Sequence, residues 1–219
     1  MTISERLRRD SDAVWRSTID HPFVVSLYAG DLPLDKFKFY ILQDYHYLVT
    51  AMRNFGVIAS RADSVEALRD IIDILHLEAT SEFKSYADFL GRLGHTVEEA
   101  SETEPIPASV SYSSFLLATS STRSFPEAIT SVLPCFWSYA EIASHHKGRL
   151  GANPSRLYRD WASVYLSDSY LGLVDKMKET VDRAGEGFAY DKLKEVFITA
   201  SRYEYMFWDA VHEGHKWPV

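Results

Sequence analysis

The chain of 219 residues contains one cysteine, ten glycines and no uninterrupted apolar run longer than four residues. A single cysteine cannot form an internal disulfide, which favours a reducing compartment, the cytoplasm. A transmembrane helix needs about 20 predominantly apolar residues, so no membrane span is expected. Sparse glycine argues against the glycine-rich loops that hold phosphate groups.

Basic residues are also in the minority. There are 23 Lys and Arg against 31 Asp and Glu, a formal net charge of −8. A partner that is itself an anion, such as nucleic acid or an acidic membrane surface, is therefore not expected. The first twenty residues are rich in charged side chains, so no secretory signal is expected either. The length predicts a single domain spanning residues 1–219.

Helix signals are abundant, and the alternating patterns of strands are nearly absent. Capping boxes, prolines in first turns and terminal glycines mark the expected boundaries. They predict helices over residues 3–19, 22–29, 33–59, 63–94, around 112–116, 124–150, from 153 with a break near Ser167, and 190–212. The acidic stretch 95–107, with two prolines, is interpreted as a surface loop. The expected fold is an all-α bundle of seven to nine elements.

Two of these helices carry a carboxylate on the apolar face. Asp44 lies three residues after Ile41 and four before Leu48, and Glu204 stands between Ala200 and Phe207. An ionised carboxylate among core residues is costly unless it is paired, hydrogen-bonded or protonated. Each could serve a purely structural ion pair. Two such positions in two helices favour a shared polar cavity.

The single cysteine is a third polar residue in an unusual position, directly after a proline inside a predicted helix. Pro134 precedes Cys135 inside the helix expected over 124–150, and proline there removes a backbone hydrogen bond and bends a helix. Tyr139 follows one turn later on the same face. A lone cysteine in an apolar helix is most often a small core residue. A nucleophilic role would require a nearby base or a lowered pKa.

Metal binding is the weaker interpretation of the polar residues. Asp73-x-x-His76 and Asp209-x-x-His212 each imitate half of a di-metal pattern. Both pairs fall partly off their apolar faces, so we interpret them as solvated side chains and expect no metal site.

Six motifs follow one another along the chain in a specific order and spacing: His21-Pro22-Phe23, Gly30-x-Leu32-Pro33, Gln43-Asp44-Tyr45-x-Tyr47, Leu133-Pro134-Cys135-x-x-x-Tyr139, Tyr165-x-Ser167 and Tyr203-Glu204-Tyr205-x-Phe207-Trp208. Taken together, they resemble the motifs of the TenA family, also called thiaminase II or aminopyrimidine aminohydrolase, across the whole chain.

The resemblance implies a heme-oxygenase-like helical bundle, a homotetramer that needs neither heme nor metal, and no other cofactor. It implies hydrolysis of thiamin or 4-amino-5-aminomethyl-2-methylpyrimidine to the hydroxymethylpyrimidine. In that family's pattern Cys135 matches the nucleophile, Glu204 the general acid and base, and Asp44 the carboxylate that holds the pyrimidine. The aromatic cage matches Tyr47, Tyr112, Tyr139, Tyr165 and Phe207.

Three other interpretations stay open at this point. The same cavity could belong to a non-catalytic pyrimidine binder or regulator, which would have no use for a nucleophile. It could belong to a metal-dependent oxidase or heme enzyme, which bound iron would reveal. A purely structural oligomer would leave the two misplaced carboxylates without a reason.

Overall fold

The computed structural model describes all residues 1–219, and its regular structure is entirely helical. The elements are α1 (Ile3–Asp10), α2 (Asp12–Ile19), α3 (Pro22–Ala29), α4 (Leu34–Ser60), α5 (Val65–Leu77), the π-helical turn η1 (Glu78–Glu82), α6 (Phe83–Arg92), α7 (Val97–Glu102), α8 (Pro107–Thr122), α9 (Phe125–His146), the 3₁₀ turn η2 (Lys147–Arg149), α10 (Arg156–Val164), α11 (Asp168–Ala184) and α12 (Tyr190–Glu213). The expected all-α bundle is confirmed.

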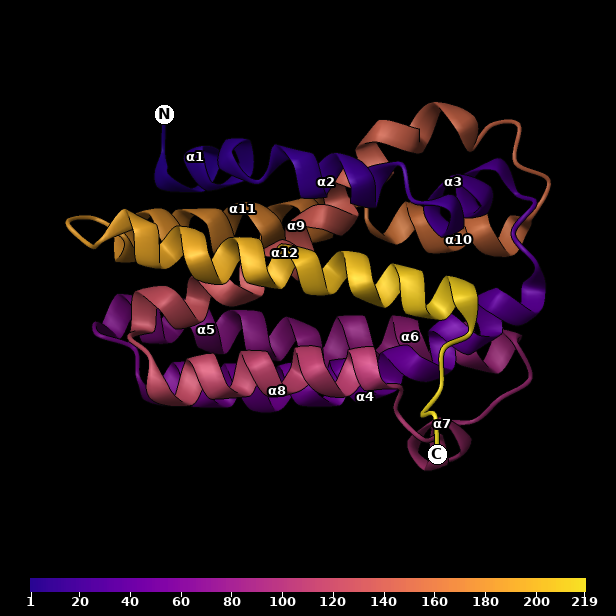
Figure 1. Ribbon diagram of the computed structural model, residues 1–219, viewed down its shortest axis with the longest axis horizontal. Coiled ribbons are helices and arrows are strands. Elements are labelled where there is room, and N and C mark those ends of the chain that lie inside the picture. Colours follow the sequence, from indigo (N-terminus) through magenta and orange to yellow (C-terminus); the bar gives the residue numbers. More distant parts are fainter.

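The long helices α9 and α12 run through the middle of the molecule and pack against each other (Figure 1). Helices α4, α5 and α8 lie below them in this view, and α1, α2 and α3 lie above (Figure 1). One continuous hydrophobic cluster extends from Leu7 in α1 to Val211 in α12. This central position of α9 and α12 brings Cys135 and Glu204, one from each helix, into the interior.

Helix starts with strong local signals are confirmed. The Ser124 and Glu127 side chains form a capping box at the start of α9. Pro22 occupies the first turn of α3, and Gly30 ends that helix in the left-handed region. In these places the chain supplies partners for the free N–H and C=O groups of a helix end from its own neighbouring residues.

Five sequence expectations about helices are wrong. The helix over 3–19 is split at Ser11, and the structure has twelve α-helices rather than seven to nine elements. The loop over 95–107 contains α7, which begins with a Thr96–Glu99 capping box. The helix over 63–94 is capped by Ser64 rather than Asp63. That last helix is also interrupted by η1, a π-helical turn that no side-chain capping bond marks.

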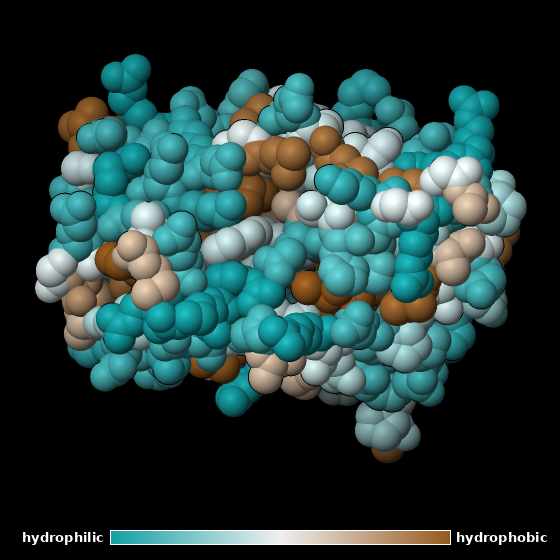
Figure 2. Space-filling view, turned by 90° about the horizontal axis from the view of Figure 1, so that it is seen from above, coloured by the Kyte–Doolittle hydropathy of each residue, from teal (hydrophilic) through white to brown (hydrophobic).

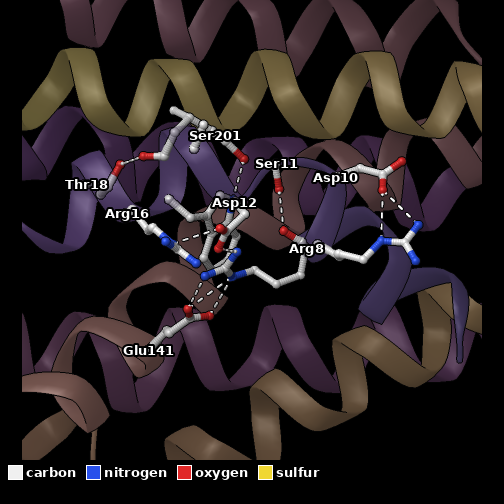
Figure 3. A network of polar contacts seen from close by, with 12 residues as sticks. Arg8, Asp10, Ser11, Asp12, Arg16, Thr18, Glu141 and Ser201 are labelled. Carbon is white, nitrogen blue, oxygen red and sulfur yellow. Dashed lines mark hydrogen bonds and ion pairs between the residues drawn. The ribbon is translucent and has the colours of Figure 1, made fainter.

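A polar network fastens the α1–α2 layer to the central helices (Figure 3). Arg8 donates through Nε to Oε2 of Glu141 in α9 at 2.8 Å, and its guanidinium also lies over the ring of Trp15. The Trp15 indole N–H donates to Ser201 Oγ in α12 at 2.9 Å. Ser201 is one turn before Glu204. This network therefore holds in place the part of α12 that carries the Glu204 carboxyl group.

On the face seen from above, hydrophilic side chains cover most of the surface and interrupt the hydrophobic patches (Figure 2). None of the helices is both long and apolar enough to cross a membrane.

The turn after α3 allows a test of the packing between distant segments. Gly30 has a φ of +89°, and a Cβ added there would lie 2.4 Å from Oδ1 of Asn153. The Asn153 amide donates to the carbonyls of Leu27 and Tyr28 at the end of α3. We expect Gly30→Ala to lower the free energy of unfolding by at least about 2 kcal/mol, from left-handed strain and disturbed hydrogen bonds.

Gly94→Ala is the matched control, because Gly94 has a similar φ of +82° but nothing within 4 Å of the added Cβ. It should cost only the strain of the left-handed conformation, about 1 kcal/mol. Urea unfolding of both variants measures the difference. Equal losses would mean that the contact with Asn153 contributes nothing.

Candidate functional site

One cavity in the interior is enclosed by side chains from α4, η1, α8, α9, α11 and α12 and by Tyr165, which follows α10. All eight residues predicted for the site line it: Asp44, Tyr47, Tyr112, Cys135, Tyr139, Tyr165, Glu204 and Phe207. They come from positions as far apart in the sequence as 44 and 207. The structure thus brings the predicted set together, while the role of each residue stays a prediction.

The cavity also contains residues that the sequence analysis missed, above all Glu78 and Glu82 from η1. The pattern that predicted Asp44, a carboxyl group on the apolar face of a helix, is present here too. Glu78 and Glu82 continue the apolar face of Ile71 and Ile74 at spacings of three and four residues. The other missed residues of the lining are Leu48, Ser109, Phe136 and Tyr170.

Asp44 is half-buried at the cavity wall, on the face of α4 that points into the bundle. Burial raises the pKa of its carboxyl well above the ordinary range, and the nearby charges of Glu82 and Glu204 raise it further. No basic side chain lines the cavity. An aspartate in this position gains from a cationic or hydrogen-bond-donating ligand, which would supply the missing partner.

Glu204 is only 3% exposed and carries the second misplaced carboxylate. Burial raises its pKa to about 7. A carboxyl group with this pKa is present in both protonation states near neutrality. It can therefore accept a proton in one step of a reaction and return it in another.

Cys135 is also buried, and α9 continues through Pro134 without a break in its helical structure. The thiol donates to the carbonyl of Val132 at 2.8 Å. Burial raises the pKa of the thiol well above its usual value, and the charge of Glu204 raises it further. The resting cysteine is thus a protonated thiol whose proton must be removed before sulfur can attack.

Aromatic rings form the walls of the cavity. Tyr47 stacks on Tyr112 with ring centroids 5.6 Å apart, and Tyr139 contacts Tyr165 at 4.9 Å. The hydroxyl groups of Tyr47 and Tyr112 are buried without a hydrogen-bond partner, as is Oγ of Ser109. Buried polar atoms nearly always have partners in folded proteins. These atoms are therefore available to a polar, flat ligand held between aromatic rings.

The weaker metal candidates take part in other contacts. Asp73 pairs with Lys176 at 2.7 Å, and the imidazole of His212 lies edge-on to that of His21. No group of three or more His, Cys, Asp or Glu side chains is arranged to hold a metal ion.

The comparison with known sequences covers nearly the whole chain. The sequence model of the TENA/THI-4/PQQC family matches residues 8–214. An aminopyrimidine aminohydrolase from Halalkalibacterium halodurans is 30% identical, covering 99% of this chain and 98% of the relative. An aminopyrimidine aminohydrolase from Helicobacter pylori is 31% identical, covering 98% of this chain and 100% of the relative.

Solved structures agree with this assignment. A TenA homologue from P. horikoshii OT3 is 44% identical and superimposes with a TM-score of 0.93, covering 98% of this chain and 100% of the other. A domain with a heme oxygenase-like fold from Shewanella denitrificans has a TM-score of 0.76 at 15% identity, covering 96% of this chain and 92% of the other, and supports the predicted fold alone. The family inferred from the sequence motifs is confirmed: the chain belongs to the TENA/THI-4/PQQC family.

Proposed function

We propose that the protein is an enzyme of thiamin salvage or degradation, an aminopyrimidine aminohydrolase. Its reaction would convert 4-amino-5-aminomethyl-2-methylpyrimidine, or thiamin, and water into 4-amino-5-hydroxymethyl-2-methylpyrimidine. The names of the relatives support this activity. The observation that carries the proposal is the burial of a thiol and a carboxyl group of pKa about 7 in one aromatic cavity.

The pyrimidine ring is assigned to the space between the aromatic walls. Tyr47 and Tyr112 are stacked on each other at one side, and Tyr139 and Tyr165 meet at another. Asp44 is the acceptor for the ring's amino group and a protonated ring nitrogen, through charge-assisted hydrogen bonds. Binding a cation lowers the pKa of Asp44 towards its ordinary value, because an opposite charge stabilises the carboxylate.

The first half of the reaction forms an adduct with the ring. The Glu204 carboxylate takes the thiol proton, and the Cys135 sulfur bonds to ring carbon 6, next to the carbon that bears the methylene. The π-electron pair of the ring bond between carbons 5 and 6 becomes the exocyclic C=CH₂ bond. The bond to the leaving group breaks, and its electron pair departs with the leaving group. A departing ammonia then accepts the proton from Glu204, whereas with thiamin the thiazole departs as a neutral group and Glu204 releases this proton to solvent.

The second half restores the ring. Water adds to the exocyclic methylene and gives a proton to the Glu204 carboxylate, which leaves the hydroxymethyl group. The electron pair of the exocyclic double bond returns to the ring, and the bond between carbon 6 and sulfur breaks. The released thiolate regains its proton from Glu204. For the protonated aminomethylpyrimidine the sum is substrate plus water giving hydroxymethylpyrimidine plus ammonium. For thiamin the products are hydroxymethylpyrimidine, the neutral thiazole and one proton, and in both cases the two side chains end unchanged.

Product analysis tests the activity directly. The purified protein, in metal-free buffer, would be incubated separately with thiamin and with the aminomethylpyrimidine, and the products separated by chromatography. We expect hydroxymethylpyrimidine from both. The substrate that is converted faster is the preferred substrate of the enzyme. If neither yields product while the ligands bind, the protein is a pyrimidine binder and the hydrolase proposal is wrong.

Assembly and location complete the proposal. A homotetramer is suggested by the family resemblance, and light scattering after gel filtration would give a mass of four chains rather than one. A cytoplasmic location fits a mechanism that needs a reduced thiol, because reducing compartments keep cysteines free.

A further inference from the structure

Two carboxyl groups in the cavity have no part in the mechanism proposed above. Glu78 is 3% exposed, lines the cavity, and its Oε1 atom has no hydrogen-bond partner. Glu82 lines the same cavity four residues later. Both belong to η1, the single π-helical turn of the chain. Both side chains reach the same cavity, and such π-helical turns recur at functional sites.

These carboxyl groups are close enough to Asp44 to influence it. Burial, then the charges of Glu82 and Asp44, raises the pKa of Glu78 well above its ordinary value, and burial raises the pKa of Glu82 to about 7. Glu82 and Asp44 also line a smaller cavity together, next to the main one. The main cavity thus holds a second pair of carboxyl groups beside the pair Asp44 and Glu204.

The composition of the lining indicates which kind of ligand such a pair fits. Four carboxyl groups and no Lys, Arg or His line the cavity. The acidic residues are not arranged as a ligand set for a metal ion. A buried carboxyl group without a partner is costly in its charged form, and an organic cation that enters the cavity replaces the proton that neutralises it.

We propose that Glu78 and Glu82 form a cation subsite that recognises the positively charged leaving group of the substrate, the ammonium of an aminomethylpyrimidine or the thiazolium of thiamin. The proposal rests on the proposed function and names the part of the substrate that the pair selects. The ring itself carries one positive charge when protonated, and Asp44 is sufficient for it. The second positive charge, on the ammonium or thiazolium leaving group, is then held by the second pair of carboxyl groups, Glu78 and Glu82.

A subsite of this kind would also assist the departure of the leaving group. An amino group departs readily only as neutral ammonia, which requires the protonated ammonium form before the bond breaks. Adjacent carboxylates favour that charged form. Once the hydroxyl group has replaced the ammonium, the product has lost the charge that the subsite holds. The same pair therefore binds substrate more tightly than product, which limits inhibition by product.

The test compares two ligands that share the ring and differ only at the methylene. Cys135→Ser is the background, because it prevents turnover, and calorimetry gives the Kd of aminomethylpyrimidine and of hydroxymethylpyrimidine. We expect the aminomethyl ligand to bind at least about tenfold more tightly. Adding Glu82→Gln or Glu78→Gln should reduce this ratio to about one, with the Kd of the hydroxymethyl ligand changed by less than about threefold.

Glu66→Gln is the matched control, because this glutamate lies in α5, is exposed, and does not line the cavity. It should leave both constants unchanged. A ratio that survives both Glu78→Gln and Glu82→Gln overturns the proposal, as does an equal weakening of both ligands, which would indicate a structural role. The binding ratio does not depend on turnover, so a failure of the hydrolase proposal in product analysis is distinguished from a failure of the subsite.

Discussion

Cys135→Ala should lower kcat/KM at least about 1000-fold for both thiamin and the aminomethylpyrimidine, because the adduct requires a nucleophile that alanine does not provide. The effect is expected on kcat rather than on binding. Asp44 and the aromatic walls, which hold the ring, are unchanged in the variant. Steady-state kinetics and the Kd of hydroxymethylpyrimidine separate these two quantities.

Unfolding does not explain such a loss. The Cys135 side chain is small, and its one polar contact is the hydrogen bond to the carbonyl of Val132. Losing it should reduce the free energy of unfolding by about 1 kcal/mol, which leaves the protein folded at room temperature. Circular dichroism of the variant confirms that the helices are intact. Turnover near the wild-type rate would contradict the nucleophilic role.

The single cysteine of the chain allows a second measurement of the same role. Alkylation of the wild-type protein can modify only Cys135, and the mass increase should match the loss of activity. Bound hydroxymethylpyrimidine should slow both together, because it covers the thiol inside the cavity. Cys135→Ser should neither react nor gain mass. Modification that leaves activity intact would place the thiol outside the chemistry.

Local signals were sufficient for much of the fold. The boundaries at Pro22, Gly30 and Ser124 follow from residues that satisfy helix ends within a few positions of themselves. The split at Ser11 and the turn η1 have no such signal, because no side-chain hydrogen bond caps the start of a helix at either place. The helix α7 is different: its Thr96–Glu99 capping box was present in the sequence and was overlooked among the acidic residues.

The site could be found from the sequence wherever a polar residue interrupts an apolar face. Asp44 and Glu204 were predicted in this way, and the same reasoning applied to the face of Ile71 and Ile74 would have found Glu78. It favoured a cavity shared by Asp44 and Glu204 but could not have placed Glu78 in the same cavity, since the distance between these groups depends on the packing of α4, α12 and η1. The chemical role of each site residue was inferred from the family resemblance and not from the helical pattern. These roles stay predictions until the activities of the variants are measured.

Glu204→Gln should lower kcat by about 100-fold to 10,000-fold, because glutamine can neither take the thiol proton nor accept one from water. The glutamine side chain has nearly the same shape, so the Kd of hydroxymethylpyrimidine should change by only a few-fold. In the wild type, kcat/KM should rise with pH through about 7, where Glu204 ionises. The variant should lack this rise. A collapse of pyrimidine affinity with a high remaining rate would assign Glu204 to binding instead.

The same substitution should make the protein more stable at high pH. The pKa of Glu204 is about 7 in the folded protein against 4.5 for an ordinary glutamate, so between these values the folded state binds more protons than the unfolded state. Stability from this group is therefore fully present below about pH 4.5 and is lost as pH rises through about 7. The loss amounts to about 3 kcal/mol, and glutamine, which does not ionise, avoids it.

Urea unfolding at pH 5 and pH 8 measures this effect. Glu204→Gln should be more stable than the wild type by less than about 1 kcal/mol at pH 5 and by about 3 kcal/mol at pH 8. Glu213→Gln, at the exposed end of the same helix, is the control and should show no such gain. If Glu204→Gln gains stability and loses activity, the ionised Glu204 carboxyl group destabilises the folded state and is retained because the reaction needs it. Equal stabilities at pH 8 would mean that Glu204 is not buried as an ionising group.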